Sequence, residues 1–221
     1  MKNLPTSHFF LMKRISTFGQ EIKNNMIRYI LIIVTLYIPT ACHRSYEEDL
    51  PLPNYRPKMK IKDFGDVSVT FPETFPCDID GDGLKDLFFK TELIGDPINR
   101  CDYHSFSFRD GSFTCSPVNS EEETPSLTAG DIIGKYSFPN HSWHFASTIV
   151  LAKKNIPLSG SSFWSGPWKD SAHKYLPFAI EKHGERYYGW LELSFSKSEE
   201  CIILHRAAVA EVAGKNVFAG Q

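Results

Sequence analysis

Hydrophobic and polar residues alternate over short stretches of this chain, a pattern typical of strands with one buried face. The stretch Val-Ser-Val-Thr-Phe at residues 67–71 is a clear example. Strands are predicted at residues 59–64, 67–71, 87–94, 103–108, 112–116, 143–153, 176–182, 187–196, 201–205 and 217–219. Turn residues separate these stretches, which predicts an all-β fold: an antiparallel, jelly-roll-like β-sandwich.

Two dipeptides predict hairpin turns between neighbouring strands. Asp110-Gly111 lies between two strand-like stretches, and so does His183-Gly184. Helical spacing of apolar residues is weak everywhere after the N-terminal segment, and the best candidates are a helix at residues 207–213 and a turn at residues 169–173.

The N-terminal segment has the pattern of a secretory signal. Residues 29–38 form an apolar run preceded by several Lys and Arg residues, and this run is too short to span a bilayer as a helix. The alternative is a short buried helix. Because Met26 directly precedes the signal, three positions before the apolar run, either Met1 or Met26 is the start of the chain.

Cys42 follows the small residues Thr40 and Ala41, an order that resembles the lipobox of bacterial lipoproteins. The resemblance implies that Cys42 is acylated and anchors the protein to a membrane of the cell envelope, at the outer membrane or the cell surface. Pro39 departs from the lipobox pattern, which prefers Leu there. We therefore divide the chain into an upstream extension with a signal helix (1–41), a tether (42–58) and a β-sandwich domain (59–221).

The tether is rich in proline, which favours an extended chain. Its acidic residues Glu47, Glu48 and Asp49 resemble the surface-export signals of Bacteroidetes lipoproteins. The alternative is a solvated charge run in a linker.

The chain contains 5 Cys, an odd number that needs an explanation in an exported protein. Acylation of Cys42 leaves four, which we expect to form two disulfides in an oxidising compartment, in one of three pairings. The four disulfide candidates are Cys77, Cys101, Cys115 and Cys201. None is spaced as a pair of zinc ligands.

The most informative stretch is an acidic loop at residues 78–86, with the pattern D-x-D-x-D-G-x-x-D. Oxygen ligands at alternating positions suit calcium, a hard cation that takes six to eight of them. The predicted ligands are the carboxylates of Asp78, Asp80, Asp82 and Asp86 and the backbone carbonyl of Leu84. The alternatives are a metal-free turn rich in Asp and Gly, and a magnesium site.

The acidic loop is not a complete EF-hand loop, because its twelfth position is Phe89 instead of Glu. A strand-like stretch follows it directly, so the loop resembles the short calcium loops of FG-GAP repeats. Residues 164–220 resemble the closing part of exported β-rich proteins of the PEP-CTERM type, through a Tyr-Leu-Pro-Phe strand and a Tyr-Gly-Trp strand. Pro177 and Tyr187 depart from that pattern. The resemblance implies a secreted β-sandwich and no catalytic residues.

Three function classes follow from these features. The first is a calcium-binding structural or binding module with a protein partner. The second is a glycan-binding module, with Trp143, Trp164 and Trp168 beside His144 as an aromatic platform, or else those Trp pack in the core. The third, less favoured, is a glycosidase using Glu185 and Glu192. A formal net charge of -2 disfavours nucleic-acid binding, and no nucleophile motif indicates an enzyme.

Overall fold

The computed structural model describes residues 56–221, and these residues form strands, turns and loops without a helix. The signal segment, Cys42 and nearly all of the tether lie outside the described residues. The strands are β1 (Met59–Val69), β2 (Thr74–Cys77), β3 (Leu87–Asp96), β4 (Cys101–Asp110), β5 (Thr114–Val118), β6 (Ile132–Ile133), β7 (Ser142–His144), β8 (Ile149–Pro157), β9 (Phe163–Ser165), β10 (Lys174–Lys182), β11 (Glu185–Ser196), β12 (Cys201–Ala210) and β13 (Val217–Phe218). Their pairings are antiparallel, so the predicted all-β antiparallel fold is confirmed.

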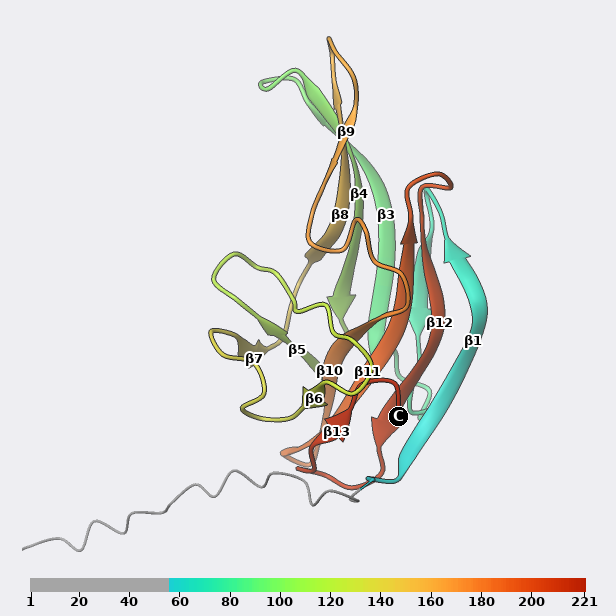
Figure 1. The fold of residues 1–221 in the computed structure, drawn as a ribbon, viewed down its shortest axis with the longest axis vertical. Helices are drawn as coiled ribbons and strands as arrows, with labels where there is room; N and C mark the ends of the chain where they lie inside the picture. The colour runs from blue at the N-terminus through green and yellow to red at the C-terminus, as the bar shows by residue number, and fades with distance from the viewer. Residues whose placement is uncertain (1–55) are drawn as a thin grey trace, which may run out of the picture. The chain divides into compact units, whose positions relative to one another are not determined.

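The strands form two large sheets and one small one (Figure 1). The first large sheet has the order β1-β12-β11-β10-β5-β7, and the second has the order β2-β3-β4-β8-β9. Strands β6 and β13 make a separate two-stranded sheet. Much of the order follows the chain, because β10, β11 and β12 are consecutive neighbours and so are β2, β3 and β4.

A hydrophobic cluster, here called the interlayer core, draws on both large sheets. From the five-stranded sheet it contains Phe89, Phe106 and Leu151, and from the six-stranded sheet Phe178 and Leu193, all with 0–1% of their surface exposed. Burying a large apolar side chain contributes about 1.5–3 kcal/mol. The interlayer core is therefore the main source of stability that holds the two sheets together.

The opposite face of β10, β11 and β12 is also covered. A second cluster, here called the outer cluster, packs Trp190 and Tyr188 against Ile133 and Val217. Both faces of the central strands are thus buried, which explains why apolar residues in β11 run on without alternating. The neighbouring strands β10 and β12 also approach Gly189 closely, because an added Cβ there would lie 2.5 Å from both the Phe178 ring and the Ala208 carbonyl oxygen.

One hairpin prediction is confirmed and the other is wrong. His183 and Gly184, both with positive φ (53° and 78°), connect β10 directly to its partner β11. Asp110-Gly111 instead carries the chain from one large sheet to the other, since β4 pairs with β3 and β8 while β5 pairs with β10 and β7. The Gly111 N–H donates to the Asp86 carbonyl (2.6 Å), so this turn supports the acidic loop rather than a hairpin.

The helix predicted at residues 207–213 is wrong, because β12 continues to Ala210. Ala207 and Ala208 pair with both β1 and β11 in the middle of the sheet, and this tertiary pairing overrides their helical propensity. The strand predicted at residues 143–153 is split in two, with its parts in different sheets. Residues 59–64 and 67–71 form mainly one strand, β1, with an irregularity between Asp63 and Val67.

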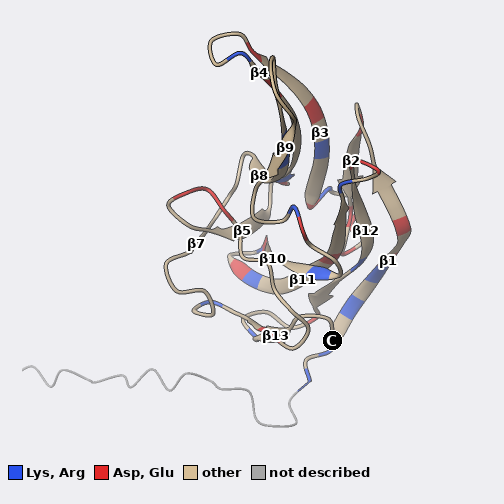
Figure 2. Cartoon of the chain, turned by 45° about the horizontal axis from the view of Figure 1, so that its top comes forward, with Lys and Arg blue, Asp and Glu red and all other residues tan. Residues whose placement is uncertain are grey.

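Charges of both signs lie along the same strands. Figure 2 shows basic and acidic positions on β1 and on β3. On β3, Lys90 and Glu92 form an ion pair. Proteins that bind nucleic-acid phosphates usually carry a stripe of basic residues, and this mixed pattern differs from such a stripe.

Candidate metal centre

The acidic loop connects β2 to β3 and is closed at its base by strand pairing. Cys77 and Leu87 face each other in the register of these strands. The Asp86 N–H donates to the Cys77 carbonyl oxygen (2.7 Å), and the Gly111 N–H caps the Asp86 carbonyl. The loop is therefore held at both ends by the sheet.

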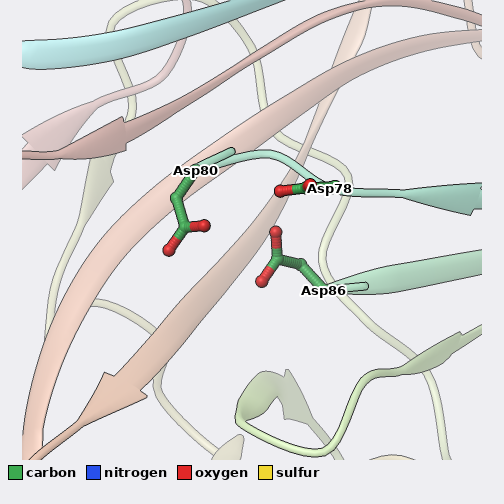
Figure 3. Close-up of side chains that lie close together, drawn as sticks. All are labelled: Asp78, Asp80 and Asp86. Carbon is green, nitrogen blue, oxygen red and sulfur yellow. The ribbon is translucent and has the colours of Figure 1, made fainter. Parts of the chain in front are cut away.

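Three of the four predicted carboxylates converge. One oxygen from each of Asp78, Asp80 and Asp86 lies within 4.8 Å of the others, and Figure 3 shows the three side chains gathered around a common space. Two oxygens that share a calcium ion, each at about 2.3–2.6 Å from it, are at most about 5 Å apart. The cluster therefore has the dimensions that one calcium ion requires.

The backbone of the loop is folded around Asp78. Its carboxylate accepts from the Gly81 N–H (2.7 Å) and from the Gly83 N–H (3.1 Å). Both glycines have positive φ, 70° and 92°, a conformation that side-chain-bearing residues rarely adopt. The glycines at these two positions thus let the loop curl so that Asp86 returns toward Asp78.

Asp82 departs from the prediction, because it is not one of the three converging carboxylates. It lies 3.0 Å from the Lys182 ammonium and accepts from the Leu84 N–H (2.9 Å). These two contacts, the Leu84 N–H first, hold the pKa of Asp82 below its usual value. The Leu84 side chain is exposed, and its backbone N–H holds the Asp82 carboxylate in place.

The cluster is partly neutralised by lysine. Lys182 also pairs with Asp80, and this hydrogen bond is the main cause that raises the pKa of Lys182 to about 12. Asp86 is different: burial, reinforced by the nearby Asp80 and Asp82 charges, raises the pKa of its carboxyl to about 6. Backbone hydrogen bonds from Ile79, whose N–H lies 2.6 Å away, and from Asp80 offset only part of this rise in pKa. A buried carboxylate with such neighbours favours a cation beside it.

A surface hollow of about 710 Å³ adjoins the acidic loop. Its lining includes residues 82–86 and Lys182. Phe113 and Phe145 also line it, although they are 58% and 53% exposed. Ligand pockets have volumes of about 300–1,000 Å³, so the hollow is large enough for a small ligand.

The three Trp residues predicted as a platform do not lie together, and this prediction is wrong. Trp168 is fully buried in the interlayer core, and its Nε1 donates to the Thr124 carbonyl (3.3 Å). Trp164 packs on that core, whereas Trp143 packs on the outer cluster. His144 lies on β7, and its ring contacts the Ser142 carbonyl of the same strand.

The predicted disulfides are absent from residues 56–221, where all four cysteines are free. Cys77 belongs to the interlayer core and Cys115 to the outer cluster, so the six-stranded sheet separates them. Cys101 begins β4 opposite Pro157, and Cys201 begins β12 opposite Ser196. Burial, the main cause, raises the pKa of the Cys115 thiol to about 11, so this thiol is a poor nucleophile at neutral pH.

The glycosidase pair is also not formed. Glu185 and Glu192 lie on the same strand, β11, seven positions apart. At about 3.4 Å per residue their backbones are separated by more than about 20 Å, and glycosidase carboxylates lie within about 9.5 Å. Glu192 is instead buried between Arg206 and His173, and these contacts hold its pKa below the usual value despite burial.

Sequence reasoning missed a polar group around His205. It contains His173, Ser194 and Asp66, which come from different strands and loops. No spacing in the sequence indicates it, since Asp66 and His205 are 139 residues apart.

Comparison of the chain with protein-family models, with curated proteins and with solved structures found no match. The resemblances to lipoproteins and to exported FG-GAP and PEP-CTERM-type proteins therefore stay predictions. Across residues 56–221, no helix is long and apolar enough to cross a membrane.

Proposed function

We propose that this chain is an exported, lipid-anchored domain whose acidic loop binds one calcium ion and which has a binding role at the cell surface. The observation that supports it most directly is the convergence of Asp78, Asp80 and Asp86 within 4.8 Å. The residues fit the ion in chemistry as well, because all three offer carboxylate oxygens, the ligands that calcium prefers.

Calcium would stabilise the loop by offsetting the repulsion among its carboxylates. Two unit charges about 4 Å apart near a protein surface interact by about 4 kcal/mol. Asp86 has its pKa raised to about 6, which indicates a carboxyl whose charge is poorly compensated. Since the loop joins β2 to β3, binding would also fix this edge of the five-stranded sheet.

Calorimetric titration with CaCl₂ tests the metal site on the purified, metal-stripped chain. We expect one ion per chain, and we expect Asp80→Asn to abolish the heat signal. Asp102→Asn is the matched control, because Asp102 is an exposed aspartate of β4 outside the loop. Equal heats from all three proteins would rule out a calcium site in this loop.

The anchor is part of the same proposal and rests on the resemblance of residues 39–42 to a lipobox. Metabolic labelling with an alkyne fatty acid tests it in a bacterial host. We expect Cys42→Ser to abolish labelling and Cys101→Ser to leave it unchanged, since Cys101 is a half-buried thiol of the folded domain. Labelling that survives in Cys42→Ser contradicts the anchor.

A second candidate function, glycan binding, is favoured by the hollow and not by the predicted Trp platform. Phe113 and Phe145 expose more than half of their surface beside the acidic loop. Aromatic rings next to a calcium ion suit a sugar, whose CH faces pack on rings while its hydroxyls meet polar groups. Binding to a polysaccharide array should fall for Phe113→Ala and not for Phe163→Ala, an equally exposed ring on β9.

For the fold, we propose that the two large sheets constitute a β-sandwich. The shared interlayer core supports this, since its side chains come from the facing sides of both sheets. The strand order has a central meander, β10-β11-β12, flanked by the non-consecutive pairs β1-β12 and β5-β10.

A further inference from the structure

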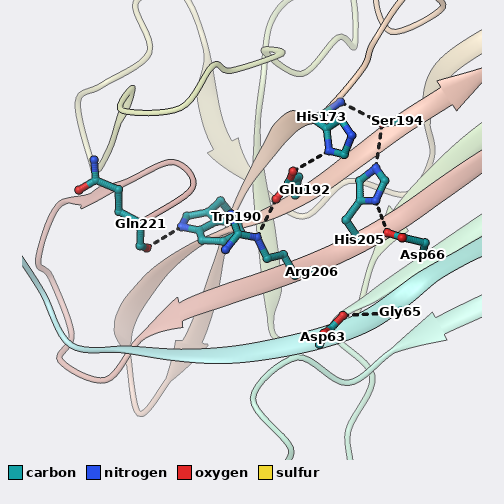
Figure 4. Close-up of polar contacts among 10 residues, drawn as sticks. All are labelled: Asp63, Gly65, Asp66, His173, Trp190, Glu192, Ser194, His205, Arg206 and Gln221. Carbon is teal, nitrogen blue, oxygen red and sulfur yellow. Dashed lines mark hydrogen bonds and ion pairs between the residues drawn. The ribbon is translucent and has the colours of Figure 1, made fainter.

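A polar group lies on the outer face of β11 and β12, beyond the outer cluster (Figure 4). Its central members are Ser194, His205 and Asp66, here called the Ser194 site. Ser194 comes from β11, His205 from β12 and Asp66 from β1. Three neighbouring strands therefore contribute one polar side chain each.

The three side chains form a chain of hydrogen bonds in a fixed order. Ser194 Oγ lies 2.8 Å from His205 Nε2, and His205 Nδ1 lies 2.5 Å from Asp66 Oδ1. A carboxylate only accepts, so it holds the proton of the neutral imidazole on Nδ1. The lone pair on Nε2 then faces the serine hydroxyl, as a general base for that hydroxyl requires.

The backbone around the site is irregular on both sides of His205. In the pairing of β11 with β12 the register shifts between Glu192 and Leu193, so that His205 has no direct partner. In the pairing of β1 with β12 the register shifts between Asp63 and Val67, so that residues 64–66 lie against the single residue His205, and Asp66 reaches it through its side chain. Such bulges re-aim side chains and are over-represented beside active sites.

Asp66 itself adopts a left-handed conformation, with φ of 58°. The preceding Gly65 has φ of 66°, and its N–H donates to the Asp63 carboxylate (2.8 Å). Residues other than glycine rarely hold such a conformation, and where they do the surrounding structure fixes it. The turn therefore serves to direct the Asp66 carboxylate at His205.

Two further residues hold the site in place. The His173 ring stacks on the His205 ring, with centroids 4.3 Å apart and planes at 19°. The His173 backbone N–H donates to Ser194 Oγ (2.9 Å), and its Nδ1 contacts Glu192 Oε1 (2.9 Å). A backbone donor at the serine oxygen favours negative charge there as the hydroxyl loses its proton.

We propose that Ser194 is the nucleophile, and His205 the general base, of an esterase site in which Asp66 is a positioning residue. Ser194 Oγ forms a bond to the ester carbonyl carbon while its proton moves to His205 Nε2. The ester C–O bond breaks, and the leaving alcohol takes that proton. Water then attacks the acyl-serine, His205 accepts and returns a proton, and the carboxylic acid leaves.

The surroundings indicate the substrate class. The Asp66 and His173 side chains are 77% and 67% exposed, so the site opens to solvent at its rim. His205 is only 13% exposed and is covered by the His173 ring, which leaves little room on the imidazole side. A small acyl group, such as acetyl, carried as an ester on a larger molecule fits these limits.

A fluorophosphonate probe tests the nucleophile on the full chain, with the labelled residue located by mass spectrometry. We expect covalent labelling at Ser194, and loss of that labelling in Ser194→Ala and in His205→Gln. Ser196→Ala is the matched control, because Ser196 lies on the same strand and face and its hydroxyl contacts the nearby Ser198 and Glu199. No labelling of the folded wild-type chain, or labelling at another serine, overturns the proposal.

Hydrolysis of p-nitrophenyl acetate tests turnover with an activated leaving group. We expect at least about a 100-fold fall in kcat for Ser194→Ala. For Asp66→Asn we expect about a tenfold or larger fall in kcat with KM unchanged, because the imidazole then loses its fixed tautomer. A merely structural Asp66 would alter thermal stability and leave kcat of the folded protein intact, and that result would overturn its role.

The esterase site is independent of the calcium proposal. The Ser194 site shares no residue with the acidic loop. We expect the same rate of probe labelling in EDTA and in excess CaCl₂, so that failure of either proposal leaves the other measurable.

Discussion

The acidic loop and the Ser194 site differ in how the chain assembles them. All candidate ligands of the loop lie within residues 78–86, and short backbone bonds such as Gly81 N–H to Asp78 fold it locally. The Ser194 site joins residues 11 and 139 positions apart, and the sheet alone brings them together. A local site can be recognised in the sequence as a motif, whereas a site built across strands depends on the register in which those strands pair.

The largest effect we predict separates the converging carboxylates from Asp82. Asp86→Asn should weaken calcium binding about a thousandfold, because a buried charged ligand near an ion contributes roughly 4 kcal/mol. Asp82→Asn should weaken it less than about tenfold, since Asp82 contacts Lys182 and lies outside the cluster. Calorimetric titration measures both.

Comparable losses for the two variants would mean that Asp82 turns from Lys182 to the ion when the ion binds. The local motif would then be a better guide to the site than the arrangement of the three carboxylates. Asp102→Asn again serves as the control outside the loop.

The next effect concerns Asp110, a buried carboxyl beside the loop but outside its motif. It accepts from Ser116 Oγ (2.8 Å) and the Ala146 N–H (2.9 Å), and burial raises its pKa to about 6. The unfolded value is about 3.9, so between about pH 4 and 6 the folded chain binds more protons than the unfolded chain. The free energy of unfolding should therefore fall as pH rises through this window, by up to roughly 3 kcal/mol.

Asp110→Asn should remove the contribution of Asp110 to the pH dependence of the free energy of unfolding. The amide resembles the protonated acid and can still bond to Ser116 and Ala146. Urea unfolding in EDTA at several pH values measures it. Asp86 has a pKa raised to the same value, so the difference between wild type and variant is the relevant quantity. A variant with an undiminished slope would assign the pH dependence to other groups.

A third effect tests the register on which the Ser194 site depends. Gly65→Ala should lower stability by about 1–2 kcal/mol, because a Cβ is unfavourable in the left-handed conformation. It should also slow probe labelling of Ser194, since Gly65 directs the turn that places Asp66. Gly214→Ala is the matched control, with φ of 70° and open space around the added Cβ, as at Gly65.

Both variants should lose similar stability, and only Gly65→Ala should lose labelling. Stability by thermal denaturation and labelling rate by gel fluorescence are measured on the same preparations. Equal labelling rates in the two variants would show that the β1 turn does not control His205.

Particular residues show what the sequence can and cannot predict. Alternation located strands such as β3 and β4, and positive φ at His183-Gly184 suited the predicted hairpin. Asp110-Gly111 has the same dipeptide chemistry as a hairpin, yet it links two sheets, because the partners of β5 come from distant strands. Trp168 lies in a stretch rich in Gly and Ser, residues 159–171, which is typical of an exposed loop. Its side chain nevertheless fills the interlayer core.

The same distinction applies to charge. The sequence predicts repulsion among four neighbouring aspartates, but not that Lys182 lies beside two of them, 100 residues away from Asp82. Glu192, a candidate glycosidase carboxylate by sequence, likewise has contacts with His173 and Arg206 that no spacing in the sequence indicates. Long-range partners decide which carboxylates are free to bind an ion.

The smallest effect follows from that last point. Lys182 contacts the carboxylates of Asp80 and Asp82, so calcium must compete with its ammonium for Asp80. An exposed or half-exposed ion pair contributes up to about 1 kcal/mol, so Lys182→Gln should raise calcium affinity by roughly two- to fivefold. Lys85→Gln is the graded control: Lys85 lies 3.9 Å from Asp78 and is 42% exposed, so its removal should change affinity less. If Lys182→Gln instead lowers affinity, the lysine orders the loop more than it competes, and even this local site depends on a distant strand.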